Sequence, residues 1–146
     1  MLKKTLALCA ASAIAVLGLG AGQAQAVTTT DCFANPSTNL STLRVDGDVY
    51  VQACIYVNGY DLQPLIRVTN NGNHSIHVDG WPNVNGSLYP AYSFTGDRAG
   101  SGWSQTFSGP IMTLGLNGSD YAQGQGDIWV DNTFYGNVYS HSVYMG

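Results

Sequence analysis

Alternating apolar and polar residues define the clearest element of the chain, a strand over residues 49–57. In "VYVQACIYV" every second residue is apolar, and the residues on that side are Val49, Val51, Ala53, Ile55 and Val57. The stretch "NGYD" follows and is typical of a tight hairpin. The return strand "DLQPLIRVT" alternates again, and its proline, which lacks an N–H group, predicts an edge strand or a bulge.

The same period of two recurs in shorter segments toward the C-terminus. We expect further strands in "HSIHVD", "WSQTFSGPIMTLGL", "GDIWVD" and "NVYSHSVYM", and a polar, flexible segment in "SDYAQGQG". Residues 80–102 contain two prolines and five glycines, which predicts a long and largely irregular connection, with room for one irregular strand in "SLYPAYSF". About seven short strands separated by turns predict an all-β protein, a single antiparallel β-sandwich.

One hairpin resembles part of a known family. The stretch "ACIYVNGYDLQPLIRVTNNG" is similar to adjacent strands of immunoglobulin-like domains in exported bacterial proteins. The resemblance implies an immunoglobulin-like sandwich. The chain lacks the Cys…Trp…Cys spacing of true immunoglobulin domains, and a shared fold implies no particular activity.

The first 26 residues have the pattern of a cleaved signal peptide. Lys3 and Lys4 precede an apolar run that ends in Ala24-Gln25-Ala26, a small-x-small cleavage site. We expect cleavage after residue 26, and a secreted β-sandwich domain over residues 27–146 that is not inserted in a membrane. An uncleaved membrane anchor is the alternative, and the glycine- and alanine-rich end of the run favours cleavage.

Charge and cysteine content restrict the partners and the compartment. Residues 27–146 carry three arginines and nine aspartates but no lysine or glutamate, a formal net charge of −6. This charge argues against nucleic acid and anionic membranes as partners. Cys32 and Cys54 remain after cleavage, and an even pair in an exported chain predicts a disulfide.

Few residues suggest catalysis or metal binding. His74 and His77 are three positions apart, so a strand points them to opposite faces, whereas His77 and Asp79 share a face. Two ligands on one face are fewer than a zinc site needs. Asp46 and Asp48 are weak candidates for Ca²⁺, and a solvated turn is the favoured interpretation. No catalytic motif occurs, so we assign no catalytic residue and no cofactor.

Aromatic residues give the strongest indication of function. In "DIWVD", Trp129 lies between Asp127 and Asp131, on the face opposite Ile128 and Val130. A flat indole ring beside carboxylates suits a sugar-binding surface, because the ring stacks on sugar C–H groups and the carboxylates accept hydrogen bonds from hydroxyls. Burial of Trp129 in the core is the alternative.

The irregular segment supplies further binding candidates. We expect Trp81 and Tyr92 in an exposed patch and Phe94 folded back over the sandwich. The complete set of candidate ligand-binding residues is Trp81, Tyr89, Tyr92, Arg98, Trp103, Asp127, Trp129 and Asp131.

Three functions remain open. The first is a non-catalytic binding module for a polysaccharide or a cell-surface ligand. The second is an inhibitor that presents residues 95–103 to a partner protease, with Arg98 as the anchor. A small secreted hydrolase ranks third.

Overall fold

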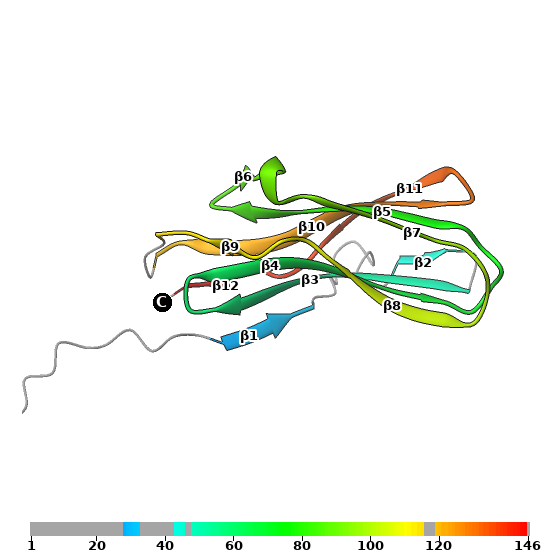
Figure 1. Cartoon of the computed structure of the whole chain (residues 1–146), viewed down its shortest axis with the longest axis horizontal. Coiled ribbons are helices and arrows are strands. Elements are labelled where there is room, and N and C mark those ends of the chain that lie inside the picture. The colour runs from blue at the N-terminus through cyan, green and yellow to red at the C-terminus, as the bar shows by residue number, and fades with distance from the viewer. Residues whose placement is uncertain (1–27, 33–42, 46–47, 116–118, 146) are drawn as a thin grey trace, which may run out of the picture.

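The chain forms two antiparallel β-sheets that pack face to face (Figure 1). The computed structural model describes residues 28–32, 43–45, 48–115 and 119–145. The first sheet consists of β1 (Thr28–Asp31), β2 (Leu43–Val45), β3 (Val49–Asn58), β4 (Asp61–Asn70), β8 (Trp103–Ser108) and β9 (Met112–Thr113). The second consists of β5 (Ile76–Val84), β6 (Ser87–Leu88), β7 (Phe94–Arg98), β10 (Tyr121–Val130), β11 (Thr133–Tyr139) and β12 (Val143–Tyr144). A 3-10 turn, η2 (Pro90–Tyr92), lies between β6 and β7.

Each sheet has two long central strands. At each edge, two shorter strands pair with different parts of the same long strand. β1 and β2 both pair with β3, and β8 and β9 both pair with β4. In the second sheet, β11 and β12 pair with β10, and β6 and β7 pair with β5. The all-β class and the antiparallel pairing are confirmed. The sequence predicted about seven strands where the described residues form twelve, because two-residue strands are too short to show a period of two.

Pro64 lies in an interior strand, opposite a gap between β8 and β9. β8 pairs with Leu65–Asn70 and β9 pairs with Asp61 and Leu62, so neither strand pairs with Pro64. In the gap, the N–H of Gly109 donates a hydrogen bond to the carbonyl of Pro64 at 3.0 Å. The missing N–H of the proline therefore costs no ladder hydrogen bond. The expectation of an edge strand is wrong. The gap between β8 and β9 accommodates the proline, as a bulge would have done.

β10 extends through a segment that looked polar and flexible in the sequence. Every second residue of "YAQGQGDIWV" is buried, and Gly124 and Gly126 occupy two of these inward positions. A Cβ atom on Gly124 would come within 2.0 Å of the carbonyl oxygen of Cys54 in the facing β3. The two sheets approach each other so closely here that only glycine fits, and the strand therefore lacks an apolar side chain that would have revealed it.

Residues 80–102 also contain more strand than expected. The first five of them complete β5, and β6 and β7 follow before the chain crosses to β8. Gly80 faces inward, and a Cβ atom on it would come within 2.3 Å of the ring of Phe94. Phe94 packs against the core, as the sequence predicted. The expectation of a largely irregular connection is wrong, because β5 supports β6 and β7 as its edge.

The apolar core is divided into two clusters. The larger consists of Val49, Val51, Ala53, Ile66, Val68, Ile76, Val78, Trp103, Phe107, Ile128, Val130 and Val138. The smaller consists of Ile55, Val57, Leu62, Val84, Met112, Ala122 and Met145. Along β10, the inward glycines lie between the residues of the larger cluster and Ala122 of the smaller one. Burial of these side chains is the main source of stability.

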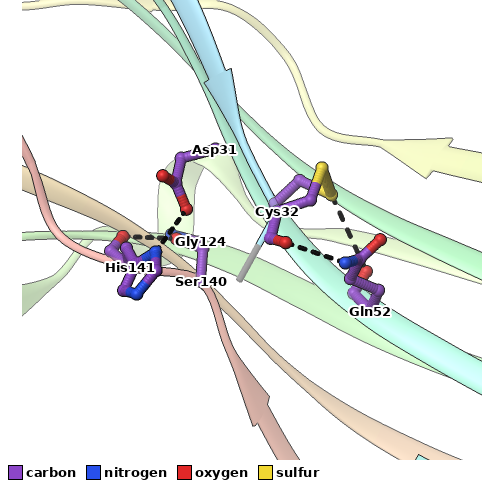
Figure 2. Close-up of a disulfide and its surroundings, with 7 residues drawn as sticks. Asp31, Cys32, Gln52, Gly124, Ser140 and His141 are labelled. Atoms are coloured by element: carbon purple, nitrogen blue, oxygen red, sulfur yellow. Dashed lines mark hydrogen bonds and ion pairs between the residues drawn. A yellow bond between two sulfur atoms is a disulfide. The ribbon is translucent and has the colours of Figure 1, made fainter. Parts of the chain in front are cut away.

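A disulfide joins Cys32 to Cys54, as the sequence predicted (Figure 2). Cys54 is fully buried on β3, and Cys32 directly follows β1, so the bridge holds the N-terminal edge strand on the first sheet. Gln52 Nε2 donates a hydrogen bond to the carbonyl oxygen of Cys32 at 2.7 Å. On the other side of β1, His141 Nδ1 lies 3.0 Å from Asp31 Oδ1, which links this edge to the C-terminal segment.

Candidate functional site

The surface of the second sheet that faces away from the first sheet carries aromatic and polar side chains in register. Even-numbered residues of β5 and β10 are buried between the sheets, so the odd-numbered residues point outward. We call this surface the outer face. It consists of His77, Asp79 and Trp81 of β5, Thr95 and Asp97 of β7, Gln125, Asp127 and Trp129 of β10, and Phe134, Asn137 and Tyr139 of β11. Strand pairing arranges these residues in three rows across the sheet.

The first row is aromatic and is centred on Trp129. The ring of Phe134 lies 5.2 Å from the indole ring on one side, and the ring of His77 lies 5.0 Å from it on the other. Both neighbours meet the indole at a steep angle, and Trp129 is half-buried between them. A shallow hollow of ≈ 300 Å³ is lined by His77, Trp129 and Asn132. Trp129 is therefore a residue of the outer face and not of the core.

His77 connects the first row to two carboxylates. His77 Nδ1 lies 2.7 Å from Asp97 Oδ1, and His77 Nε2 lies 3.4 Å from Asp79 Oδ1. The hydrogen bond with Asp97 raises the pKa of His77 above its usual value, partial burial opposes this rise, and the charge of Asp79 adds to it. The two carboxylates thus stabilise the charged form of the imidazole relative to a free histidine.

The second row places two carboxylates opposite each other on neighbouring strands. Asp79 of β5 pairs directly with Asp127 of β10. Thr95 Oγ1 donates a hydrogen bond to Asp79 at 2.7 Å, and Asn137 Nδ2 donates one to Asp127. Partial burial raises the pKa of Asp127, the hydrogen bond from Asn137 lowers it, and the charge of Asp79 raises it further. Like charges directly opposite each other are destabilising in a sheet, so this row costs stability.

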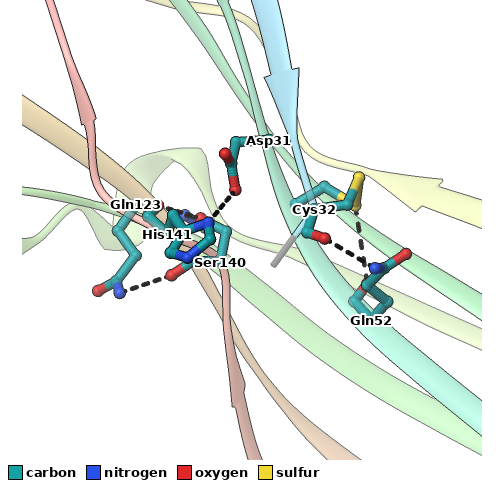
Figure 3. A network of polar contacts seen from close by, with 8 residues as sticks. Asp31, Cys32, Gln52, Gln123, Ser140 and His141 are labelled. Atoms are coloured by element: carbon teal, nitrogen blue, oxygen red, sulfur yellow. Dashed lines mark hydrogen bonds and ion pairs between the residues drawn. A yellow bond between two sulfur atoms is a disulfide. The ribbon is translucent and has the colours of Figure 1, made fainter. Parts of the chain in front are cut away.

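The third row contains Trp81, which is half-buried and bonded to a chain of polar side chains that begins on the neighbouring strand β10. Trp81 Nε1 donates to Gln125 Oε1 at 3.4 Å, Gln125 Nε2 donates to Gln123 Oε1 at 2.9 Å, and Gln123 Nε2 donates to the carbonyl of Ser140 at 2.7 Å. The buried hydroxyl of Ser140 accepts from the N–H of Gly124, and Figure 3 shows this end of the network beside the disulfide. The network orients the glutamine that meets the indole ring.

A groove adjoins Trp81. Its volume is ≈ 390 Å³, and it is lined by Asp79, Trp81, Leu88, Pro90, Ser93, Phe94 and Thr95. Leu88 is 50% exposed and Pro90 is exposed, so one wall of the groove is apolar and open to solvent. Tyr89 and Tyr92 instead pack against the smaller core cluster. Of the pair expected in an exposed patch, Trp81 lies on the outer face and Tyr92 packs inward.

Trp103 lies in the core, and Arg98 lies at the edge of the outer face, where it lines a hollow of ≈ 320 Å³ with His77 and Asp97. Trp103 is only 8% exposed and belongs to the larger core cluster, because it takes an inward position of β8. Its Nε1 donates a hydrogen bond to the carbonyl of Gly100 at 2.9 Å. The guanidinium of Arg98 lies 4.7 Å from the centre of the Trp103 ring, and Nη1 donates to Gln105 at 2.6 Å. Arg98 also pairs with Ile76 at the end of β7, so it lies in a strand and not at the tip of a free loop.

Asp131 does not flank Trp129 as the sequence suggested. β10 ends at Val130, and Asp131 occupies the following turn with a φ of 50°. Its Oδ1 accepts the N–H of Ser75 at 2.9 Å, and its Oδ2 lies 2.7 Å from His74 Nδ1. The hydrogen bond from His74 lowers the pKa of Asp131, and the hydrogen bond from Ser75 lowers it further. Asp131 therefore fastens the β4–β5 connection to the β10–β11 turn.

The candidate calcium ligands and the expected signal peptide lie only in part within the described residues. Asp46, residues 1–26 and their cleavage site lie outside the described residues. Asp48 is exposed, and its carbonyl accepts the N–H of Asn71 at 2.8 Å. Among the residues that the structure describes, no group of three or more His, Cys, Asp or Glu side chains is arranged to hold a metal ion.

Sequence reasoning missed most of the outer face. His77, Asp79 and Trp81 are alternate residues of one strand, so they lie on the same face of the sheet. The stretch "HVDGW" already shows this spacing, provided that the strand is continued through Gly80. The partners on β7 and β11 had no comparable signal, because they depend on which strands become neighbours. Comparisons with protein-family models, curated proteins and solved structures find no match to this chain.

Proposed function

We propose that this chain is an exported, non-catalytic binding domain that holds a carbohydrate on the outer face. The observation that carries the proposal is the row of carboxylates between two half-buried indole rings, those of Trp129 and Trp81. Indole rings stack on the C–H faces of sugars, and carboxylates accept hydrogen bonds from sugar hydroxyls. A central strand pair carries all four side chains, which keeps the surface rigid.

The surroundings of the two indole rings support this proposal. A hollow of ≈ 300 Å³ adjoins Trp129, and the groove of ≈ 390 Å³ adjoins Trp81. These volumes are at the lower end of the range for small-ligand sites, as expected for a surface that binds a chain lengthwise and does not enclose it. Hydrogen bonds from Thr95 and Asn137 fix the two carboxylates before any ligand arrives.

We also propose that the fold is immunoglobulin-like. The order β3–β4–β8 in one sheet and β7–β5–β10–β11 in the other corresponds to strands A-B-E and C′-C-F-G of such domains. The disulfide differs, because it lies at the edge of the first sheet and does not join the two sheets. Export of the chain is supported by this disulfide and by the signal-like first 26 residues.

The alternative of a protease inhibitor has less support. An inhibitor loop presents an extended segment to the protease, whereas residues 94–98 pair with β5 along their whole length. The side chain of Arg98 is engaged by Gln105 and by the Trp103 ring. Binding to a serine protease would require these contacts to break.

Retention on insoluble polysaccharides tests the proposal. Purified protein is mixed with cellulose, chitin, xylan and β-1,3-glucan, and the fraction left in solution is measured. We expect retention on at least one of them, and loss of affinity by about tenfold or more, equivalent to about 1.4 kcal/mol, in Trp129→Ala. Retention of Trp129→Ala equal to that of the original protein, or no retention of either, would reject the proposal.

A matched control is available on the first sheet. Tyr60 lies in the β3–β4 turn and is 53% exposed, so Tyr60→Ala removes an exposed aromatic ring far from the outer face. We expect this variant to bind as the original protein does. A serine-protease panel run in parallel tests the inhibitor alternative.

A further inference from the structure

We infer that the ligand of the outer face is an uncharged, unbranched chain of at least three sugar rings that lies along the strands. This inference rests on the proposed function, and it adds the length, the direction and the charge of the ligand. It follows from the positions of the two indole rings relative to the carboxylate row.

The two indole rings are too far apart for one small sugar. Trp129 is level with His77, and Trp81 lies four residues further along the same strand β5. Four residues of antiparallel strand span about 14 Å, and neighbouring strands lie about 4.8 Å apart. A ligand that contacts both indole rings must therefore extend about 14 Å or more, roughly the length of three linked pyranose rings.

The carboxylates occupy the middle of this path. Asp79 and Asp127 are level with each other, two residues from each indole ring, or about 7 Å along the strands. A sugar placed over them offers hydroxyl groups to two acceptors, while the sugars at either end lie over the indole rings. Along the strands, an indole ring, a pair of carboxylates and a second indole ring thus follow one another at a spacing similar to that of successive sugar rings.

The alternative direction, across the strands, fits less well. A chain over the first row would meet Phe134, Trp129 and His77 in turn, and then the Asp97 carboxylate that already bonds His77. It would reach neither the Asp79–Asp127 pair nor the groove beside Trp81. Hollows adjoin both paths: one beside Trp129 and one beside Trp81 on the lengthwise path, and one beside Trp129 and one beside His77 and Asp97 on the crosswise path. The lengthwise direction is therefore favoured by the carboxylate pair and the second indole ring.

The charges of the outer face select against acidic chains. Its acidic side chains are Asp79, Asp97 and Asp127, and His77 is its basic side chain. A uronic acid or sulfated sugar over the second row would bring a third negative charge to two carboxylates that already repel each other. An uncharged sugar meets no such penalty.

The length series of soluble oligosaccharides tests this inference on the original protein. We measure affinity calorimetrically for the mono- to pentasaccharides of the β-1,4-linked glucose, N-acetylglucosamine, mannose and xylose series and the β-1,3-linked glucose series. In the series that binds, we expect the trisaccharide to bind about tenfold more tightly than the disaccharide, and longer chains to gain little more. Oligogalacturonate of the same length is expected to bind at least about tenfold more weakly at low salt.

Two matched variants test the direction. In Trp81→Ala the advantage of the trisaccharide over the disaccharide should fall to within about twofold, because the third ring loses its stacking partner. Phe134 is 51% exposed and flanks Trp129 across the strands, so Phe134→Ala should keep the full advantage. The length series needs no variant, so it decides the question even if Trp81→Ala folds poorly.

Other outcomes overturn the inference. A disaccharide that binds as tightly as the trisaccharide would show that the ligand need not be three rings long. If the trisaccharide loses its advantage in Phe134→Ala and keeps it in Trp81→Ala, the ligand does not lie along the strands. Equal binding of oligogalacturonate would show that the site does not select uncharged sugars. If no oligosaccharide binds, the inference fails. The proposed function fails with it only if the retention test on insoluble polysaccharides also rejects it.

Discussion

Gly124 of β10 lies directly against the backbone of Cys54 in the facing sheet. A Cβ atom at this glycine would come within 2.0 Å of the Cys54 carbonyl oxygen and 2.7 Å of its carbonyl carbon. The same Cys54 forms the disulfide with Cys32 on the far side of β3. A close approach of the two sheets and the attachment of the N-terminal strand therefore meet at one residue of β3.

Substitution of this glycine tests how closely the sheets approach. We expect Gly124→Ala to lower the free energy of unfolding by about 1–3 kcal/mol or more, the cost of overpacking, because the opposing atoms are backbone and cannot rotate away. Urea denaturation measures the change. Gly115→Ala is the control, since a Cβ atom there meets nothing within 4 Å, and it should stay within about 0.5 kcal/mol. Equal stability of the two variants would contradict the close approach.

Reduction of the disulfide should weaken the fold without abolishing it. Cys32 and Cys54 are separated by 22 residues in sequence. Closing a loop of this size contributes about 3 kcal/mol in the chain-entropy model, while the core clusters remain without it. We expect unfolding at lower urea in the presence of a reductant, and the same shift in the Cys32→Ala/Cys54→Ala variant. An unchanged midpoint would show that the bridge contributes nothing measurable to stability.

Protonation of His77 should stabilise the fold. Its pKa is raised in the folded state, mainly by the hydrogen bond with Asp97, so its contribution is fully present below the unfolded value of about 6.5. The contribution is lost as the pH rises through the folded pKa. The side chain is 37% exposed, so we expect a small effect. An NMR titration of the imidazole measures the pKa, which should fall in Asp97→Asn; an unchanged value would show that Asp97 is not its main partner.

The link that Asp131 forms between the β4–β5 connection and the β10–β11 turn should depend on its side-chain oxygen atoms and on its positive φ. Its pKa is lowered in the folded state, so its contribution to stability is present above the usual aspartate range and is lost as the pH falls through the lowered value. Asp131→Asn retains an acceptor for the Ser75 N–H and tolerates the positive φ. We expect hydrogen exchange at Ser75 to accelerate strongly in Asp131→Ala and little in Asp131→Asn. Equal exchange in the two variants would argue against this link.

The predictable parts of the fold are those where apolar side chains fill the space between the sheets. β3 alternates clearly because its inward positions hold apolar side chains that are buried in the core, from Val49 to Val57. β10 is hidden in the sequence because the same inward positions hold Gly124 and Gly126, where the sheets touch. The pattern of hydrophobicity thus fails where packing is tightest.

The candidate site was predictable only within single strands. The parity of Asp127 and Trp129 placed them correctly on one face of β10. Asp131 was misplaced because the strand ends one residue before it, and Trp103 was misplaced because its strand turns it inward. Asp79 and Asp127 lie opposite each other because β5 pairs with β10, a strand more than 40 residues further along the chain. The alternation of apolar and polar residues within each strand does not show which strands pair.

The indole N–H signals of the three tryptophans report directly on whether a ligand binds at the outer face. Trp81 and Trp129 lie on the outer face, whereas Trp103 is 8% exposed and bonds the carbonyl of Gly100. We expect titration with the tightest-binding oligosaccharide of the length series to shift the signals of Trp81 and Trp129 and to leave that of Trp103 in place. Binding that leaves the Trp81 and Trp129 signals unchanged would show that the oligosaccharide binds elsewhere.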